Sequence, residues 1–96
     1  MAENFKILVH RSSESVHLKL IGDFDAVSAD DLFCAVKKNI MGAGRIFVHT
    51  NGLESIHAFD RTTFRNNLST IVGSAVRLVF TGKNGAMMAP EGSRLL

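Results

Sequence analysis

The sequence predicts an α/β domain with a mixed four-stranded sheet, in which the first strand is antiparallel, the others are parallel, and the helices pack chiefly on one face. The main observation is the order of patterns along the chain, which runs strand, strand, helix, strand, helix, strand. A strand–helix–strand unit joins parallel strands through a right-handed crossover, whereas a short polar connection joins antiparallel strands. Because 96 residues support a single core, we expect one domain over residues 1–96.

The first two strands are predicted at the β-rich runs FKILVH and VHLKLIG, which the small polar segment RSSES joins as a hairpin. In the second run Val16, Leu18 and Leu20 share one face. His17 and Lys19 point to the other face. One face of the hairpin is therefore expected to enter the core, and the other to meet solvent in part.

The segment SADDLFCAVKKNIMGAG predicts the first helix. Ser28 is expected to cap its amino end, and Gly42 or Gly44 to end it. Between these signals, apolar residues recur at helical spacing and form one stripe, which consists of Leu32, Val36 and Ile40. Cys34 lies within this helix and is expected to be a buried, unreactive thiol.

The second half of the chain predicts a strand at RIFVHT, a helix at DRTTFRNNLSTIVG and a fourth strand at AVRLVFTG. Asp60 is a good helix cap, and Phe59 and Phe64 flank it at the spacing of a hydrophobic staple. Residues 83–96 hold the only proline and are expected to form an irregular or short-helical tail, with a helical turn after Pro90.

The composition, 46% hydrophobic and 21% charged, is that of an ordinary globular protein, and the net charge of +2 is a weak basic bias. Binding of nucleic acid would require Arg45 and Arg77 to merge with other cations and would require exposed aromatic residues, whereas the phenylalanines follow core periodicity. We therefore expect no nucleic-acid partner. No apolar run can span a bilayer and no signal peptide is recognisable, so no direct membrane insertion is expected. A single cysteine suits a reducing compartment, and the cytoplasm is the expected location.

Three polar loops follow the predicted parallel strands, with the sequences GDFDA, TNGLESIHAFD and TGKNGAMM. The carboxyl ends of parallel strands meet at one edge of a sheet, where the functional loops of such folds collect. This edge is therefore the candidate functional site.

These segments resemble the STAS domain family, which includes anti-sigma factor antagonists and domains at the ends of sulfate transporters. VHLKLIGDFDAVSADDLFCAVKKNI resembles the family's opening strand, turn and helix. RIFVHTNGLESIHAF resembles its third strand and the start of the next helix, with His57 in place of an aspartate and Ala58 in place of a serine. In the family that serine is phosphorylated by a partner kinase that is also the anti-sigma factor. Because alanine has no hydroxyl, the resemblance implies a divergent member that is not switched at residue 58.

The resemblance implies a non-catalytic protein-interaction module in bacterial regulation, anti-sigma factor antagonist-like, or in a transport-associated complex. The implied partner is a kinase-like anti-sigma factor, a transporter or an ATPase subunit, and a homo-oligomer is compatible with this role. The candidate partner-binding residues are Asp23, Phe24, Asp25, Ala26, His57, Ala58, Asp60, Arg61, Thr62 and Arg65. Thr62 or Thr63 becomes the phosphate acceptor only if the motif is shifted along the chain. The alternative function is a small-ligand or nucleotide sensor that uses the same edge.

The sequence supports metal binding and catalysis less well than it supports binding of a protein partner. His17 and His49 become neighbours if their strands pair, but two histidines without a carboxylate make a poor metal site. The aspartates of GDFD could converge with His57 and Asp60 as an acid–base group, although capping and turn preference already explain these aspartates. We therefore expect no metal, no cofactor and no enzymatic activity.

Overall fold

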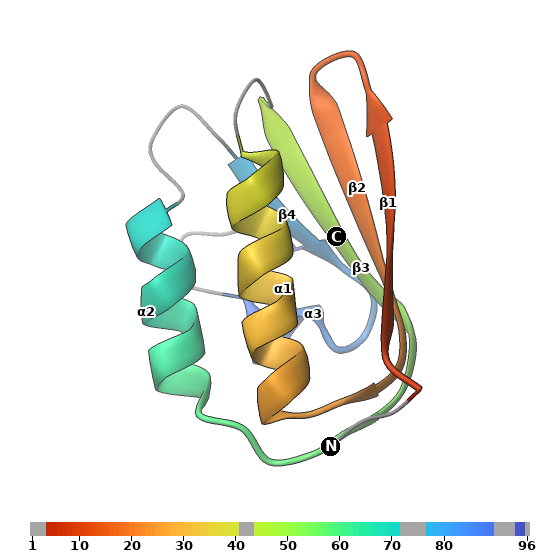
Figure 1. The fold of residues 1–96 in the computed structure, drawn as a ribbon, viewed down its shortest axis with the longest axis vertical. Helices are drawn as coiled ribbons and strands as arrows, with labels where there is room; N and C mark the ends of the chain where they lie inside the picture. Colours follow the sequence, from red (N-terminus) through yellow and green to blue (C-terminus); the bar gives the residue numbers. More distant parts are fainter. Residues whose placement is uncertain (1–3, 41–43, 72–76, 90–93, 96) are drawn as a thin grey trace.

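Five strands form one sheet, in the spatial order β1 (Lys6–Ser12), β2 (Ser15–Phe24), β3 (Arg45–Ile56), β4 (Arg77–Thr81) and β5 (Arg94–Leu95) (Figure 1). The computed structural model describes residues 4–40, 44–71, 77–89 and 94–95. β1 is antiparallel to β2, and every other neighbouring pair is parallel. The predicted mixed α/β sheet is confirmed, and the short β5 adds a fifth strand within the segment predicted as a tail.

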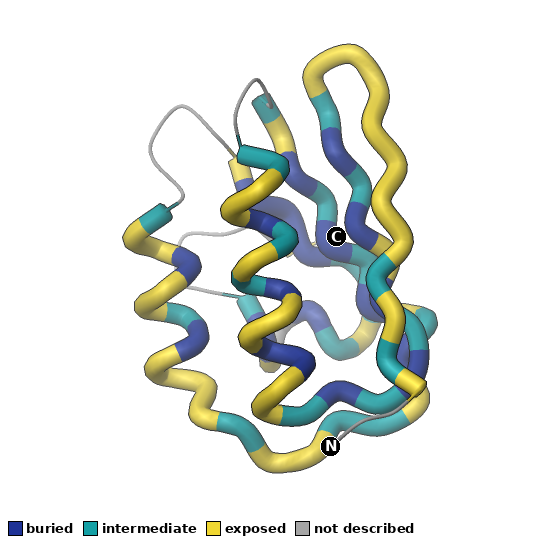
Figure 2. Tube along the Cα trace, viewed as in Figure 1, coloured by how far each residue is buried: buried dark blue, intermediate teal, exposed yellow. Residues whose placement is uncertain are grey.

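The two long helices, α1 (Ala26–Asn39) and α2 (Arg61–Ile71), lie on the same face of the sheet (Figure 1). Buried residues line the sides of the helices and strands that face each other (Figure 2). No helix among the described residues has the length and apolar character needed to cross a bilayer. The largest fully buried side chains of this core include Phe24, Phe80, Leu18, Leu20, Leu32, Ile46, Leu68 and Met88.

The first helix begins at Ala26 because Asp25 caps it, so the prediction that Ser28 is the cap is wrong. The Asp25 carboxylate accepts hydrogen bonds from the Ser28 backbone N–H at 2.9 Å and from the Ser28 hydroxyl at 3.0 Å. A carboxylate satisfies both donors and also supplies the negative charge that a helix amino end favours. The helix ends at Asn39, before Gly44, while Gly42 lies outside the described residues.

The third strand is longer than predicted, since it continues past Thr50 to Ile56. Its second half pairs with the end of β2, where Asp23 lies opposite Ser55 and Phe24 opposite Ile56, after two shifts in register. The segment NGLESI, expected to lead into the next helix, therefore satisfies its backbone groups in the sheet. This pairing carries both strands to the edge predicted to hold the functional site.

The predicted tail also contains one turn of helix, α3 (Gly85–Met88), which precedes the position expected for it. Pro90 lies outside the described residues, so a turn after it is not described. Met88 is fully buried in the core, whereas Met87 is exposed. The tail thus closes the open end of the core with one methionine side chain.

Candidate functional site

A small cleft lies between the first half of α1 and the start of α2 and has a volume of ≈ 130 Å³. Phe33, Phe59 and Phe64 give it an aromatic lining, and the exposed side chains of Asp30 and Asp60 border it. The other lining residues are Ala26, Ala29, Thr63 and Asn67. We call this hollow the α1–α2 cleft. It combines an apolar interior with two carboxylates at its edge.

Asp60 fixes the start of α2, as the sequence predicts. Its carboxylate accepts hydrogen bonds from the Thr63 backbone N–H at 3.0 Å and from the Thr63 hydroxyl at 2.8 Å. These two bonds hold the pKa of Asp60 below its usual value, so the carboxylate stays charged at neutral pH. The Phe59 and Phe64 rings meet edge to face with their centroids 5.7 Å apart, which confirms the predicted hydrophobic staple.

Phe24 supports the cleft from inside and cannot itself contact a partner, so its assignment to a binding surface is corrected. Its side chain is fully buried. Its ring centroid lies 5.7 Å from that of Phe5, 5.1 Å from that of Phe59 and 6.1 Å from that of Phe64, all in edge-to-face geometry. The aromatic lining of the cleft therefore rests on the ring of Phe24.

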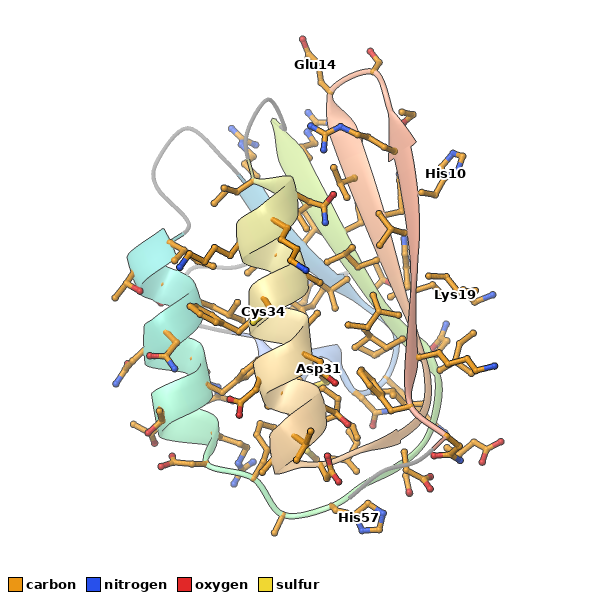
Figure 3. All side chains as sticks on the ribbon, in the orientation of Figure 1. His10, Glu14, Lys19, Asp31, Cys34 and His57 are labelled. Carbon is orange, nitrogen blue, oxygen red and sulfur yellow. The ribbon has the colours of Figure 1, made fainter. Side chains whose placement is uncertain are left out.

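The remaining candidate residues differ in how far they reach solvent. Arg65 is half-buried, and its Nη2 donates a hydrogen bond of 2.8 Å to the carbonyl of Met87, which ties α2 to α3. Asp23 and Asp25 are also half-buried. The exposed candidates are Ala26, His57, Ala58, Asp60, Arg61, Thr62 and Thr63. The structure thus brings together the starts of both helices and leaves the segment around residue 58 on the surface beside them (Figure 3).

Ser55 joins this region, which the sequence did not indicate because the strand was expected to end at Thr50. The Ser55 hydroxyl donates a hydrogen bond of 2.6 Å to the Asp23 carboxylate and lies 3.3 Å from Nε2 of His57. In a catalytic triad the carboxylate orients the imidazole, which in turn activates the serine. Here the carboxylate binds the serine directly, so the serine is not activated by this arrangement. Beyond Thr50 the apolar residues Leu53 and Ile56 are three positions apart, so no alternation in the sequence marks the extension of the strand.

Two other histidines lie on the face of the sheet away from α1 and α2. Nδ1 of His17 and Nε2 of His49 are 2.9 Å apart, and Nδ1 of His49 lies 2.7 Å from the hydroxyl oxygen of Thr81. The two imidazoles are parallel, at an angle of 0°. Because ring N–H groups and lone pairs lie in the ring plane, this hydrogen bond places the imidazoles side by side in one plane. The predicted neighbourhood of His17 and His49 is confirmed.

Phe47 lies on the same face, which corrects the expectation that every phenylalanine belongs to the core. Its ring is parallel to that of His17 within 6°, with the centroids 4.6 Å apart.

The same face also carries two arginines, since Arg45 and Arg77 are register partners on neighbouring strands. Among the described residues, no group of three or more His, Cys, Asp or Glu side chains is placed to hold a metal ion.

The pair of histidines predicts a pH-dependent stability. Burial lowers the pKa of His49, and the charges of His17 and Lys19 lower it further. Since the unfolded chain has an ordinary histidine pKa of about 6.5, it binds protons more readily than the folded chain. The contribution of His49 to stability is therefore present above about pH 6.5 and is lost as the pH falls through the lower pKa of the folded state.

Urea unfolding of the wild type and of His49→Gln, at several pH values between about 5 and 7, measures this contribution. We expect the wild type to lose more stability than the variant as the pH falls. An NMR titration of the imidazoles should find the pKa of His49 below the ordinary value. Equal pH dependence of the two proteins would contradict the assignment.

Cys34 is exposed on α1, so the prediction of a buried thiol is wrong. The apolar stripe of the helix runs through Leu32 and Val36, which are fully buried. Cys34 lies midway between them along the chain and therefore points to another side of the helix.

No family model and no curated protein matches the sequence. The similar proteins described below were found by comparison of structures. The anti-sigma factor antagonist SpoIIAA in its unphosphorylated form is similar with a TM-score of 0.61 and 15% identity, over 96% of this chain and 86% of that one. An uncharacterised protein of the DUF3478 family with a SpoIIAA-like fold, from Shewanella loihica PV-4, is similar with a TM-score of 0.57 and 13% identity, over 100% and 90% of the two chains.

A third similar structure, Mglu, has a TM-score of 0.64 and 17% identity, and the match covers 90% of this chain but only 20% of that protein. At such identities the likeness concerns the fold. The chain therefore has the SpoIIAA-like α/β fold that its resemblance to STAS domains predicts.

Proposed function

We propose that this chain is a non-catalytic protein-interaction module of the anti-sigma factor antagonist type, in bacterial regulation or in a transport-associated complex of the cytoplasm. The α1–α2 cleft is the observation that carries this proposal. It lies beside the segment that holds Ala58, and its aromatic lining is open to a partner side chain.

The chemistry of the cleft indicates what its partner presents. Phe33, Phe59 and Phe64 favour an apolar group, and Asp30 and Asp60 favour a positive charge at its end. Arginine and lysine combine both features, because an aliphatic stem carries the charged head. The partner surface is therefore expected to insert such a side chain between the two helices.

Phosphorylation at the position implied by the family has no acceptor here, because residue 58 is alanine. Ala58 also precedes the helix cap, whereas Thr62 and Thr63 lie in the first turn of α2. The Thr63 hydroxyl is bonded to Asp60, so Thr62 is the better acceptor of the two. Phosphopeptide analysis of the native protein tests this point, and a phosphate on Thr62 would establish a shifted switch.

The alternative of a small-ligand or nucleotide sensor is less well supported. Ligand pockets commonly have volumes of about 300–1,000 Å³, whereas the α1–α2 cleft has ≈ 130 Å³. A rise in melting temperature with a nucleotide or metabolite would favour the sensor.

A non-catalytic role is supported by the hydrogen bonds of Ser55. Its hydroxyl donates to the Asp23 carboxylate, whereas in a catalytic triad the carboxylate would bind the imidazole, here that of His57, and the imidazole would activate the serine.

Two variants of adjacent residues on α2 test the interaction. Asn67 lines the cleft, and Asn66 is also exposed but does not line it. Asn67→Arg should fill the cleft, because the new side chain can place its charge near Asp30 and Asp60. We expect affinity capture from native cells to recover a kinase-like anti-sigma factor, transporter or ATPase subunit with the wild type and with Asn66→Arg, but not with Asn67→Arg.

Both variants should unfold at nearly the wild-type urea concentration, since both positions are exposed on a helix. Recovery of the same proteins by all three baits would show that the cleft is not the binding site. Failure of the wild type to recover any such partner would contradict the proposed function itself.

A further inference from the structure

The face of the sheet opposite α1 and α2 has a composition unlike that of the rest of the surface. Register places Lys19 and His49 side by side on β2 and β3, and Arg45 beside Arg77 on β3 and β4. Figure 3 shows His10 and Lys19 projecting from the hairpin away from the two helices. We call this surface the open face. Its outward side chains include Lys6, His10, His17, Lys19, Arg45, Phe47, His49, Arg77 and Thr81.

Charge over most of the open face is of one sign. The sequences of β1 and β4, and those of residues 15–22 and 45–53, contain no aspartate or glutamate. The described carboxylates of these strands and of their hairpin lie toward the ends of the face, with Glu14 at the tip of the hairpin (Figure 3), Asp23 near the end of β2 and Glu54 near the end of β3. The four lysine and arginine side chains are exposed. Such a surface favours an anionic partner.

Planar rings occupy the middle of this basic surface. His17 and His49 lie in one plane, and Phe47 is parallel to both, within 6° of His17 and 5° of His49. Arg45 precedes these rings along β3, and Lys19 lies opposite His49. Cations therefore flank a set of parallel π-systems on two sides. A nucleobase can extend that set by stacking, because every base has a π-face.

We propose that the open face binds single-stranded nucleic acid, with Lys19, Arg45 and Arg77 contacting phosphates and the His17, Phe47 and His49 rings stacking with bases. An acidic polypeptide would use the charges but not the rings, so the parallel rings favour nucleic acid. This proposal is independent of the partner at the α1–α2 cleft, which lies on the other side of the sheet. It revises the expectation from the sequence, which assigned Phe47 to the core.

Fluorescence anisotropy with labelled single-stranded RNA and DNA of roughly 12 nucleotides tests the proposal. We expect binding that weakens steeply between about 50 mM and about 200 mM salt. The double variant Lys19→Gln with Arg77→Gln should bind about tenfold more weakly, with a salt slope smaller by about 1.4, since each lost phosphate contact removes about 0.7. Comparison of RNA with DNA shows whether the 2′-hydroxyl contributes.

The matched control is Lys37→Gln with Lys38→Gln, which removes the same charge from exposed positions on α1. It should retain wild-type affinity. Phe47→Leu tests the stacking and should weaken binding of the oligonucleotides about fivefold or more, while binding of heparin, a polyanion without bases, stays unchanged. Unfolding in urea checks that every variant is folded.

Four results would overturn the proposal. The first is no binding of either oligonucleotide at low salt, and the second is equal weakening by both double variants. The third is an effect of Phe47→Leu on heparin equal to its effect on oligonucleotides. The fourth is stronger binding to vesicles of anionic lipid than to oligonucleotides, which would assign the open face to a membrane surface instead.

Discussion

Phe24→Ala is expected to lower the free energy of unfolding by about 3–5 kcal/mol, the usual cost of removing a buried phenyl ring. The ring of Phe24 is fully buried and makes edge-to-face contacts with Phe5, Phe59 and Phe64. Its removal leaves a cavity and also ends three aromatic contacts. Because a domain of this size has a total stability of about 5–15 kcal/mol, urea unfolding should show a large shift of the midpoint.

Phe47→Ala is the matched control, since it removes the same ring from the open face. Phe47 is half-buried, so less apolar area is exposed to water when its ring is lost, and a smaller loss of stability is expected. Phe24→Ala should also weaken partner capture although residue 24 never reaches the surface, because Phe59 and Phe64 line the α1–α2 cleft and rest on it. A loss no larger than that of Phe47→Ala would contradict the role of Phe24 as the support of the cleft.

Local patterns predicted the parts of this fold that depend on neighbours in sequence. The stripe of Leu32 and Val36 and the staple of Phe59 and Phe64 require only helical spacing, and each is found in the structure. The extension of β3 to Ile56 depends on pairing with β2, which brings together residues about thirty positions apart. No local pattern contains that pairing, and the hydrogen bond between Ser55 and Asp23 was missed for the same reason.

Phe47 shows a second limit of sequence patterns. In RIFVH the apolar residues run without interruption, so alternation gives no sign of which of them face the helices. The structure places Ile46 and Val48 in the core and Phe47 on the open face. The hydrophobicity of Phe47 therefore suggested burial, whereas the pleat of the strand decides its side.

The net charge of +2 likewise conceals a separation that only the fold reveals. Carboxylates border the α1–α2 cleft, and cations occupy the open face on the other side of the sheet. The net charge of the whole chain hides this separation, because cations and carboxylates on different sides of the molecule offset each other in the sum. The two proposed partners are therefore of opposite charge, and both can occupy the module at once because the sheet separates them.

Gly52→Ala is expected to destabilise the protein by about 1–3 kcal/mol, which is typical of forcing an added methyl group into a filled space. A Cβ at residue 52 would collide with the carbonyl oxygen of Leu20 and lie 3.3 Å from Cγ1 of Ile21. The first of these is a backbone atom of the neighbouring strand, which cannot move away as a flexible side chain does. The strands β2 and β3 must separate at the point where their register shifts.

Gly44→Ala provides the control for Gly52→Ala. A Cβ at residue 44 would meet nothing closer than the carbonyl oxygen of Glu14 at 3.6 Å, an ordinary contact, so its stability should change little. Urea unfolding of both variants should separate them, and equal midpoints would contradict the proposed collision. The pairing of Asp23 with Ser55 lies just beyond Gly52, so hydrogen exchange there should quicken in Gly52→Ala alone. Gly52 is thus required by the close approach of two strands that position the functional edge.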